Sequence, residues 1–517
     1  MKISTVKLLA AAVGSIAALN TAQALNPTDT ANADVSIYIS GGGAADGNLE
    51  LVIKALLAAG GASNIDTYTY NGAKSDFWAV SGTIPNAAVL GPGFSGSKNV
   101  AFYKRTNGAA FQGVGPVAAN ASIAHLDITQ ILPANYNAAT HTGNVTGTLN
   151  LNAGAGTGLK KVASDAGITD VNPELFTSAI NVPASETIPS AASIARLTVR
   201  PTNAAVHGVA VTLALRNALQ TQQGLTAGAE DEANIPSLSR SAIASIYQGT
   251  IYDWTQIVHN GVRLVVPSGY SSEVYVVPRS PGAAIQASIN ARILNAPSSP
   301  VALGPASQSL AFAPYVYEAA LPGDVDKILD ALDKGTATGT WNDGANVAHA
   351  FTGTKALAIG SQSTEKNTDD AANSGGKKDL LRYRFIKIDG VAPTVRNTYN
   401  GTYPLTVEQV ILYRNASAPN PLTGIKKALV DYLVKESATP AILGNTNLKF
   451  FHGYGQTGYS ALSVNGFAVG AFNSAAPVTG YTFGPSGVNT DLGRTPILDS
   501  GSVDGNGNLL APDLITK

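Results

Sequence analysis

Residues 276–294 read VVPRSPGAAIQASINARIL and combine a strand, a tight turn and a helix in one short run. The Val-Val pair is typical of a buried strand, Pro281 and Gly282 mark a turn, and a helix is expected to begin at Ala283. A strand that enters a helix through a glycine turn directs unpaired backbone N–H groups and the positive helix end toward one point. Arg279 adds a guanidinium beside that point. The run therefore predicts an anion-binding loop.

The first 24 residues predict an export signal. Lys2 and Lys7 precede an apolar run at residues 8–19, and an Ala-Gln-Ala sequence that ends at Ala24 fits a small-residue cleavage site. The run is shorter than the roughly 20 residues that cross a bilayer, so cleavage after Ala24 is favoured over a membrane anchor. No Cys follows this point, which excludes a lipid-linked lipoprotein. We expect a mature chain that is periplasmic or secreted and not membrane-embedded.

The composition excludes several classes of function. The chain has 517 residues, a formal charge of −1, 13% charged residues and no Cys. This length suffices for two lobes that are held together by core burial alone. The absence of Cys excludes disulfides, thiol nucleophiles, Cys-ligated zinc and iron–sulfur clusters. Nucleic acids and anionic membrane surfaces require basic fields, so neither is expected as a partner.

Strand-like and helix-like segments alternate along the chain. A strand-like run at residues 35–39 (VSIYI) ends in a glycine loop and precedes a helical pattern at residues 49–59, which is the opening unit of an α/β lobe. Further strands are expected at residues 100–103, 208–215, 356–359 and 383–388, and helices at residues 238–249, 324–332, 407–413 and 425–434. This order predicts mostly parallel sheets, with ligands bound at strand ends between two lobes. A polar surface loop or hairpin insertion is expected at residues 134–160, and an irregular tail beyond residue 470.

Several segments resemble those of phosphate-type periplasmic solute-binding proteins, and they occur in the same order. They are residues 40–45 (SGGGAA), 166–173 (AGITDVNP), 238–254 (LSRSAIASIYQGTIYDW), 279–285 (RSPGAAI), 358–360 (AIG) and 403–406 (YPLT). Together they bracket residues 33–470. The chain also resembles an uncharacterised proteobacterial branch of exported proteins with this fold. That likeness rests on Lys104-Arg105, residues 362–367 (QSTEKN) and residues 385–390 (FIKIDG).

The resemblance implies a two-lobed α/β periplasmic-binding-protein type II fold. Lobe I would comprise residues 33–212 and 385–470, lobe II residues 213–384, and residues 471–517 an irregular extension. The implied ligand is a small anion such as phosphate or a relative, held between the lobes, and the implied partner is an ABC transporter permease. No cofactor and no metal are implied. The ligand-binding residues on this alignment are Gly42, Gly43, Ala44, Thr106, Asn107, Thr169, Asp170, Arg279, Ser280 and Gly282.

Two of these residues have a second interpretation. Asp170 corresponds to the family Asp that accepts a proton from a protonated oxyanion, yet an Asp before Asn-Pro also caps turns. Arg279 suits bidentate pairing with an anion, yet it also suits a salt bridge to a carboxylate. Ala283 and Ile285 stand where the family carries hydroxyl donors, and each lost hydrogen bond to a charged ligand costs about 1.5–3 kcal/mol. Tight binding of free phosphate is therefore not expected unless other polar side chains compensate.

Enzymatic motifs are not found in the sequence. It has no Gly-x-Ser-x-Gly elbow and no His-Glu-x-x-His helix, and its 6 His are scattered. Residues 91–98 (GPGFSGSK) reverse the Lys-Ser order of a phosphate-binding P-loop. Residues 504–508 (DGNGN) are followed by neither the sixth-position Gly nor the twelfth-position Glu of a calcium loop. A non-enzymatic solute-binding protein is the first hypothesis. The second, a secreted surface or interaction protein that reuses the fold with a degenerate anion site, stays open.

Overall fold

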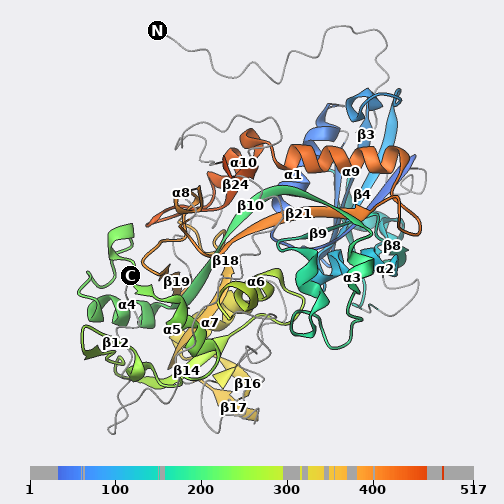
Figure 1. The fold of residues 1–517 in the computed structure, drawn as a ribbon. Helices are drawn as coiled ribbons and strands as arrows, with labels where there is room; N and C mark the ends of the chain where they lie inside the picture. Colours follow the sequence, from blue (N-terminus) through green and yellow to red (C-terminus); the bar gives the residue numbers. More distant parts are fainter. Residues whose placement is uncertain are drawn as a thin grey trace, which may run out of the picture.

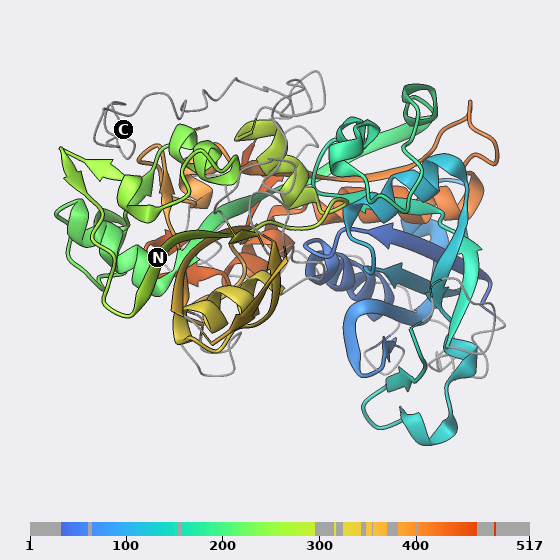
Figure 2. The same ribbon diagram turned by 90° about the horizontal axis from the view of Figure 1, so that it is seen from below.

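The computed structural model describes residues 33–59, 61, 65–149, 151, 158–294, 315–316, 324–342, 348–353, 355–369, 381–399, 402–462 and 480–481. The expected signal segment and all of the expected tail except residues 480–481 lie outside them. The described elements form two lobes, one built from the blue to cyan part of the chain and one from the green to yellow part (Figure 1). Figure 2 shows the same two lobes from below, with the last elements of the chain contributing to both.

Lobe I is organised around strand β1 (Val35–Gly41), which pairs parallel with a strand on each side. These neighbours are β4 (Lys98–Arg105) and β9 (Ala166–Thr169). Antiparallel strands extend the sheet on both sides, namely β3 (Ala73–Ile84), β2 (Ile65–Tyr70) and β21 (Thr406–Arg414). Helices α1 (Asp46–Ala58) and α9 (Gly424–Ser437) bury Leu and Val side chains against this sheet, so the lobe has a core of its own.

Lobe II has an equivalent centre. Strand β14 (Tyr270–Val277) pairs parallel with β18 (Lys355–Ser363) and with β15 (Tyr315–Val316). Antiparallel strands extend this sheet, namely β16 (Thr338–Asn342), β17 (Ala348–Thr352) and β19 (Tyr383–Phe385). The helices of this lobe are α4 (Leu213–Gln222), α5 (Arg240–Tyr247), α6 (Ala284–Arg292) and α7 (Asp324–Lys334). Parallel strands at the centre of each lobe, covered by helices, confirm the expected two-lobed α/β class.

One long strand, β10 (Leu197–Thr212), belongs to both sheets. Its first part pairs antiparallel with β21 in lobe I, up to Val206 opposite Thr406. Its last part, from His207, pairs antiparallel with β18 and β19 in lobe II. The change of sheet at residues 206–207 makes β10 a direct connection between the lobes, and the strand runs from one to the other in Figure 1.

Two sequence-based expectations need correction, and a third is met. Residues 407–413 were expected to be a helix but lie in strand β21, because the β-branched and aromatic side chains of TVEQVILYR fit a strand that pairs on both sides. The strand expected at residues 208–215 ends at Thr212, since Leu213 already starts α4. The hairpin alternative expected for residues 134–160 is confirmed in the described part of that range: β6 (Tyr136–Asn137) pairs with β7 (Thr142–Val145), and β7 joins the sheet of lobe I parallel to β2.

The remaining elements are short. Two-residue pairs are β11 (Ser237–Leu238) with β20 (Lys387–Ile388), β12 (Val258–His259) with β13 (Val262–Arg263) and β22 (Phe451–His452) with β23 (Gly455–Gln456). Strand β5 (Ser122–Leu126) pairs with β8 (Leu159–Ala163), and β24 (Tyr459–Leu462) pairs with β10 and β25 (Gly480–Tyr481). Short helices are α2 (Gly115–Ala119), α3 (Ala191–Ile194), α8 (Val395–Tyr399) and α10 (Pro440–Asn447).

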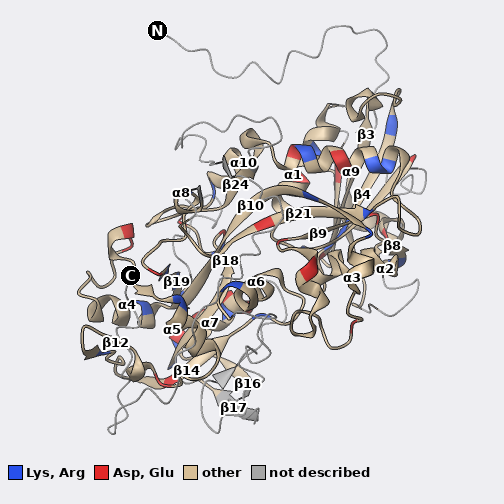
Figure 3. Cartoon of the chain, viewed as in Figure 1, with Lys and Arg blue, Asp and Glu red and all other residues tan. Residues whose placement is uncertain are grey.

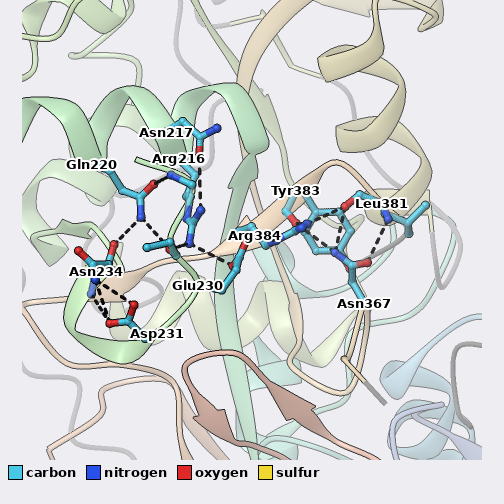
Figure 4. A network of polar contacts seen from close by, with 12 residues as sticks. Arg216, Asn217, Gln220, Glu230, Asp231, Asn234, Asn367, Leu381, Tyr383 and Arg384 are labelled. Carbon is cyan, nitrogen blue, oxygen red and sulfur yellow. Dashed lines mark hydrogen bonds and ion pairs between the residues drawn. The ribbon is translucent and has the colours of Figure 1, made fainter. Parts of the chain in front are cut away.

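A partly buried ion network connects two elements of lobe II. Glu230 accepts from Arg216 of α4 at 3.1 Å and from Arg384 of β19 at 3.0 Å, so one carboxylate joins a helix to the sheet (Figure 4). Arg216 also donates to the carbonyl oxygen of Ala229. Because Arg216 is only 1% exposed, these partners replace the water that its guanidinium loses on folding. The network therefore ties α4 to β19 within lobe II.

Charged residues of both signs are scattered over the described chain, with Lys, Arg, Asp and Glu side chains on both lobes (Figure 3). None of the described helices combines the length and hydrophobicity that a bilayer crossing needs.

Candidate functional site

One cavity of about 350 Å³ lies between loops of the two lobes. Lobe I lines it with Gly42, Gly43, Ala44, Asp46, Thr106 and Asp170. Lobe II lines it with Arg279, Ala283, Ala284, Ile285, Gln362 and Glu365. His207 also lines it, at the position where β10 changes from one sheet to the other. Loops distant in sequence thus face one space.

Lobe I lines the cavity with the glycine loop at residues 41–43, whose carbonyl oxygens accept hydrogen bonds from the buried Lys104. Gly41 has a φ of +117°, and a Cβ there would lie 2.0 Å from the carbonyl oxygen of Ile168, so only glycine fits between β1 and β9. Lys104 is 1% exposed and donates to the carbonyl oxygens of Gly41 (2.8 Å) and Gly42 (3.3 Å). Its Nζ also lies 3.0 Å from Asp46 Oδ1. Burial lowers the pKa of Lys104, and the Asp46 charge opposes that change.

Asp46 is the first residue of helix α1, and its carboxylate also contacts the loop that follows β4. Thr106, which follows β4, donates its hydroxyl to Asp46 Oδ2 at 2.5 Å. Lys104 Nζ lies 3.2 Å from the same hydroxyl. The three side chains form a closed group, in which the cation and the carboxylate neutralise each other beneath the cavity.

Asp170 stands directly after β9 with its carboxyl against the glycine loop. A Cβ on Gly42 would lie 3.0 Å from Asp170 Oδ2, so the absence of a side chain there lets the carboxyl approach. Gln409 donates to Asp170 Oδ1 at 2.8 Å. Burial raises the pKa of Asp170 to about 7, and the nearby charge of Glu365 acts in the same direction against the Gln409 hydrogen bond. Asp170 therefore holds or releases a proton near neutral pH.

The loop at the start of α6 matches its predicted form. Strand β14 ends at Val277, Gly282 adopts a φ of +97°, and α6 begins at Ala284. The Gly282 N–H donates to the carbonyl oxygen of Asn181 (2.8 Å), and the Gly282 carbonyl accepts from the N–H of Phe111 (2.9 Å). The turn is thus bonded to elements of lobe I. The first N–H groups of α6 have no acceptor within the helix and point back toward this turn.

Arg279 lines the cavity and lies near the start of helix α7. Burial lowers its pKa, and the carboxylates of Asp324 and Asp326 at the start of α7 oppose that change. Both interpretations of Arg279 therefore have support, because one guanidinium faces the cavity and has carboxylates near it. Its own backbone N–H is held by Gln286 Oε1 at 3.0 Å, which orients the residue at the strand end.

A tyrosine joins the two walls of the cavity. The hydroxyl of Tyr459 in β24 lies 2.6 Å from the carbonyl oxygen of Ala44 and 2.8 Å from Glu365 Oε2. It shares its one proton between a loop of lobe I and a turn of lobe II. Tyr459 is 2% exposed, and burial raises its pKa well above the usual range. Glu365 also lies 3.7 Å from Lys366 Nζ.

Six of the ten predicted site residues line the cavity and four do not. Asn107 donates to Asp76 Oδ1 (2.6 Å), and the Thr169 hydroxyl accepts from the Val171 N–H (3.3 Å), so both are engaged elsewhere. Ser280 and Gly282 shape the turn behind the cavity. Sequence reasoning did not assign Asp46, Lys74, Ser75, Ala109, Ala110, His207, Gln362, Ser363, Glu365 and Lys366, which also line it. Among these residues, only those in the run at residues 362–367 had a sequence signal, and that signal indicated resemblance to the exported branch and not a binding role.

The comparisons with known proteins give a likeness at the level of structure only. No protein-family model and no curated protein matches the chain. Similar solved structures include a putative phosphate ABC transporter substrate-binding protein with bound phosphate from Clostridium perfringens, with a TM-score of 0.36 and 12% identity over 77% of this chain and 92% of that one. PstS from Borrelia burgdorferi gives a TM-score of 0.31 and 9% identity over 78% and 93%. An ABC-type phosphate transport receptor from Vibrio cholerae gives 0.27 and 15% over 53% and 75%. With scores this low, ligand and partner have to be argued from this chain's own residues.

Proposed function

We propose that this chain is an exported, non-enzymatic solute-binding protein of the phosphate-binding type. It holds a small anion between its two lobes and passes it to an ABC transporter permease, after cleavage of residues 1–24 and export to the periplasm or beyond. One observation carries the proposal. Loops from both lobes line a single cavity at the place where β10 leaves one sheet and enters the other.

The proposed mechanism is closure of the lobes about their connections. The change of sheet at residues 206–207 is the first connection, and the return of the chain from β20 to β21 is the second. We propose residue 206 and the start of β21 as the limits of lobe I. A ligand that contacts both walls favours the closed state, because only that state offers both sets of contacts at once.

Asp170 and Arg279 would select the ligand from opposite walls. Arg279 and the start of α6 attract negative charge. Asp170 accepts a hydrogen bond when ionised and repels a ligand that presents only negative charge. A pKa near neutral pH lets the protein reach either protonation state without a large cost in free energy.

A second candidate function has a specific observation in its favour. The Gly282 N–H is bonded to the Asn181 carbonyl oxygen, and the Ala283 N–H to the Ser280 carbonyl oxygen (3.2 Å). Two backbone donors of the loop are therefore already used. Together with Ala283 and Ile285 in place of hydroxyl residues, this favours a surface or interaction protein that retains the fold with a degenerate anion site.

Thermal melts of the purified mature protein distinguish the two functions. A solute-binding protein should melt at a higher temperature with at least one member of a panel of phosphate, arsenate, sulfate and small organic anions, because a ligand that binds only the folded state stabilises it. An Asp170→Leu variant, which keeps a side chain of similar size without the carboxyl, should lose the shift. Unchanged melting with every anion in the parent would instead support the interaction protein.

A further inference from the structure

The cavity has room for more than a bare tetrahedral oxyanion. Its volume of about 350 Å³ equals that of roughly a dozen waters at ~30 Å³ each, whereas phosphate has five non-hydrogen atoms. Sites of roughly 300 Å³ and above are typical of organic ligands. With an inorganic ion in this space, many of the lining residues would contact water and not the ligand.

One side of the cavity is apolar. Ala109 and Ala110 precede and start the short helix of lobe I at Ala110–Gly113, and Ala283, Ala284 and Ile285 start α6 in lobe II. Four of these five side chains are less than 9% exposed. The two positions where the resembled family carries hydroxyl donors are part of this wall. Their replacement removes donors for an oxyanion and supplies a surface for carbon atoms.

The rest of the lining needs hydrogen-bond donors and acceptors from the ligand. The carboxyls of Asp170 and Glu365 face the cavity from opposite lobes, and each accepts a hydrogen bond. His207 Nδ1 is buried and has no hydrogen-bond partner among the described residues, and the Gln362 side chain is hydrogen-bonded to Tyr383. Burial lowers the pKa of His207 to about 3, so its ring is neutral. A fully deprotonated inorganic ion could donate no further hydrogen bond to either carboxyl.

We infer that the ligand is a short organic acid that also carries a hydroxyl or amino group. Its acidic group lies toward Arg279, its donor toward Asp170 and Glu365, and its carbon chain against the apolar side of the cavity formed by Ala109, Ala110 and residues 283–285. This inference rests on the proposed function, because it names the class of solute for the same site. Hydroxy and amino acids share the required chemistry, and the test separates them.

Calorimetric titrations of the parent protein with four probes test the inference. The probes are inorganic phosphate, butyrate, racemic 3-hydroxybutyrate and 4-aminobutyrate. We expect the hydroxy acid or the amino acid to bind about tenfold or more tightly than butyrate, as one hydrogen bond to a charged group predicts, and also more tightly than phosphate. Whichever of the two binds identifies the donor.

A double substitution provides the reciprocal test. Ala283→Ser with Ile285→Thr restores two hydroxyls to the wall and should reverse the preference, with phosphate gaining about tenfold and the organic acid losing a similar factor. Ala88→Ser with Val89→Thr adds the same two hydroxyls on an exposed surface and should not change the ranking of the probes. The ranking of probes on the parent requires no variant, so a variant that fails to fold does not remove the test.

The outcomes separate this inference from the proposed function. Phosphate binding more tightly than all three organic probes would overturn the inference and leave the proposed function standing. Equal binding of butyrate and 3-hydroxybutyrate, with no tighter binding of 4-aminobutyrate, would overturn the assignment of a donor group. No binding of any probe, together with no thermal shift in the anion panel, would contradict the proposed function itself.

Discussion

Gln409 donates from Nε2 to Asp170 Oδ1 at 2.8 Å, between two strands that pair antiparallel at the edge of the interlobe cavity. Gln409 is fully buried, and its position in β21 fixes the amide opposite the end of β9. The bond orients the Asp170 carboxyl, yet burial still raises its pKa to about 7. The Asp170 carboxyl is thus held in one orientation, while its protonation state changes near neutral pH.

This pKa predicts how stability depends on pH. The unfolded chain releases the Asp170 proton near pH 4, whereas the folded protein keeps it up to about pH 7. The folded state therefore binds more protons in this window, and the contribution of Asp170 to stability falls as pH rises from about 4 to 7. Asp170→Asn should remove that fall, which is on the order of a few kcal/mol.

Urea unfolding at several pH values between 4.5 and 8 checks this prediction. The exposed Glu232→Gln serves as a control and should keep the parent's pH dependence. An Asp170→Asn protein with the same pH slope as the parent would show that another group is responsible.

Gly282→Ala should destabilise the turn at the cavity by about 1–2 kcal/mol or more. A φ of +97° is strained for any residue with a Cβ, and that Cβ would lie 3.1 Å from Pro183 Cγ and 3.4 Å from Phe111 Cβ. Gly93 has a φ of +91° and nothing within 4 Å of such a Cβ, so Gly93→Ala reports strain without crowding. Urea midpoints measure both. Equal losses in the two variants would mean that the contacts with Pro183 and Phe111 add nothing.

Removal of the Tyr459 hydroxyl should weaken the link between the lobes. Tyr459→Phe keeps the ring and leaves the Ala44 carbonyl oxygen and the Glu365 carboxylate without their shared donor, at a cost of about 1–3 kcal/mol. Backbone amides around residues 42–46 should exchange hydrogen faster as the glycine loop loosens. Tyr252→Phe, on a side chain that is 43% exposed, is the matched control. Unchanged exchange in this loop would argue against the bridge.

Arg279→Ala should abolish most of the binding of anionic ligands that the parent shows, because no other guanidinium among the described residues lines the cavity and its lysines, Lys74 and Lys366, already pair with Glu50 and Glu365. The control is Arg240→Ala, which removes an arginine that pairs with Asp389 outside the cavity at 2.6 Å. Titration calorimetry with the best ligand of the parent measures the effect. Retained affinity in Arg279→Ala would assign Arg279 to the carboxylates of α7 alone, as its second interpretation holds.

Much of the fold was predictable because the periodicity and turn residues of many segments favour the same helix or strand that the tertiary structure contains. The strand, turn and helix at residues 276–294 and the first unit at residues 35–59 have clear periodicity and glycine turns, and both formed as expected. The helix prediction for residues 407–413 was wrong because the apolar positions of VEQVILY fit both the 3.6-residue period of a helix and the two-residue period of a strand. Only pairing with β10 and β9 decides for a strand.

The site was predictable in part for a related reason. Residues that follow strands, such as Asp170 and Arg279, are brought together by the general rule that strand ends meet at one edge. Asp46, His207 and Glu365 come from a helix start, the change of sheet in β10 and a turn after β18. Their convergence depends on how the two lobes sit against each other, which no local pattern encodes.

Native mass spectrometry of the protein purified from the periplasm of its own host tests the central claim most directly. We predict a mature chain that carries one small organic acid, together with an Asp170→Leu, Arg279→Ala double variant, prepared in parallel, that carries none. The parent's mass without any adduct, or the same adduct on the double variant, would contradict the binding of a solute at the interlobe cavity.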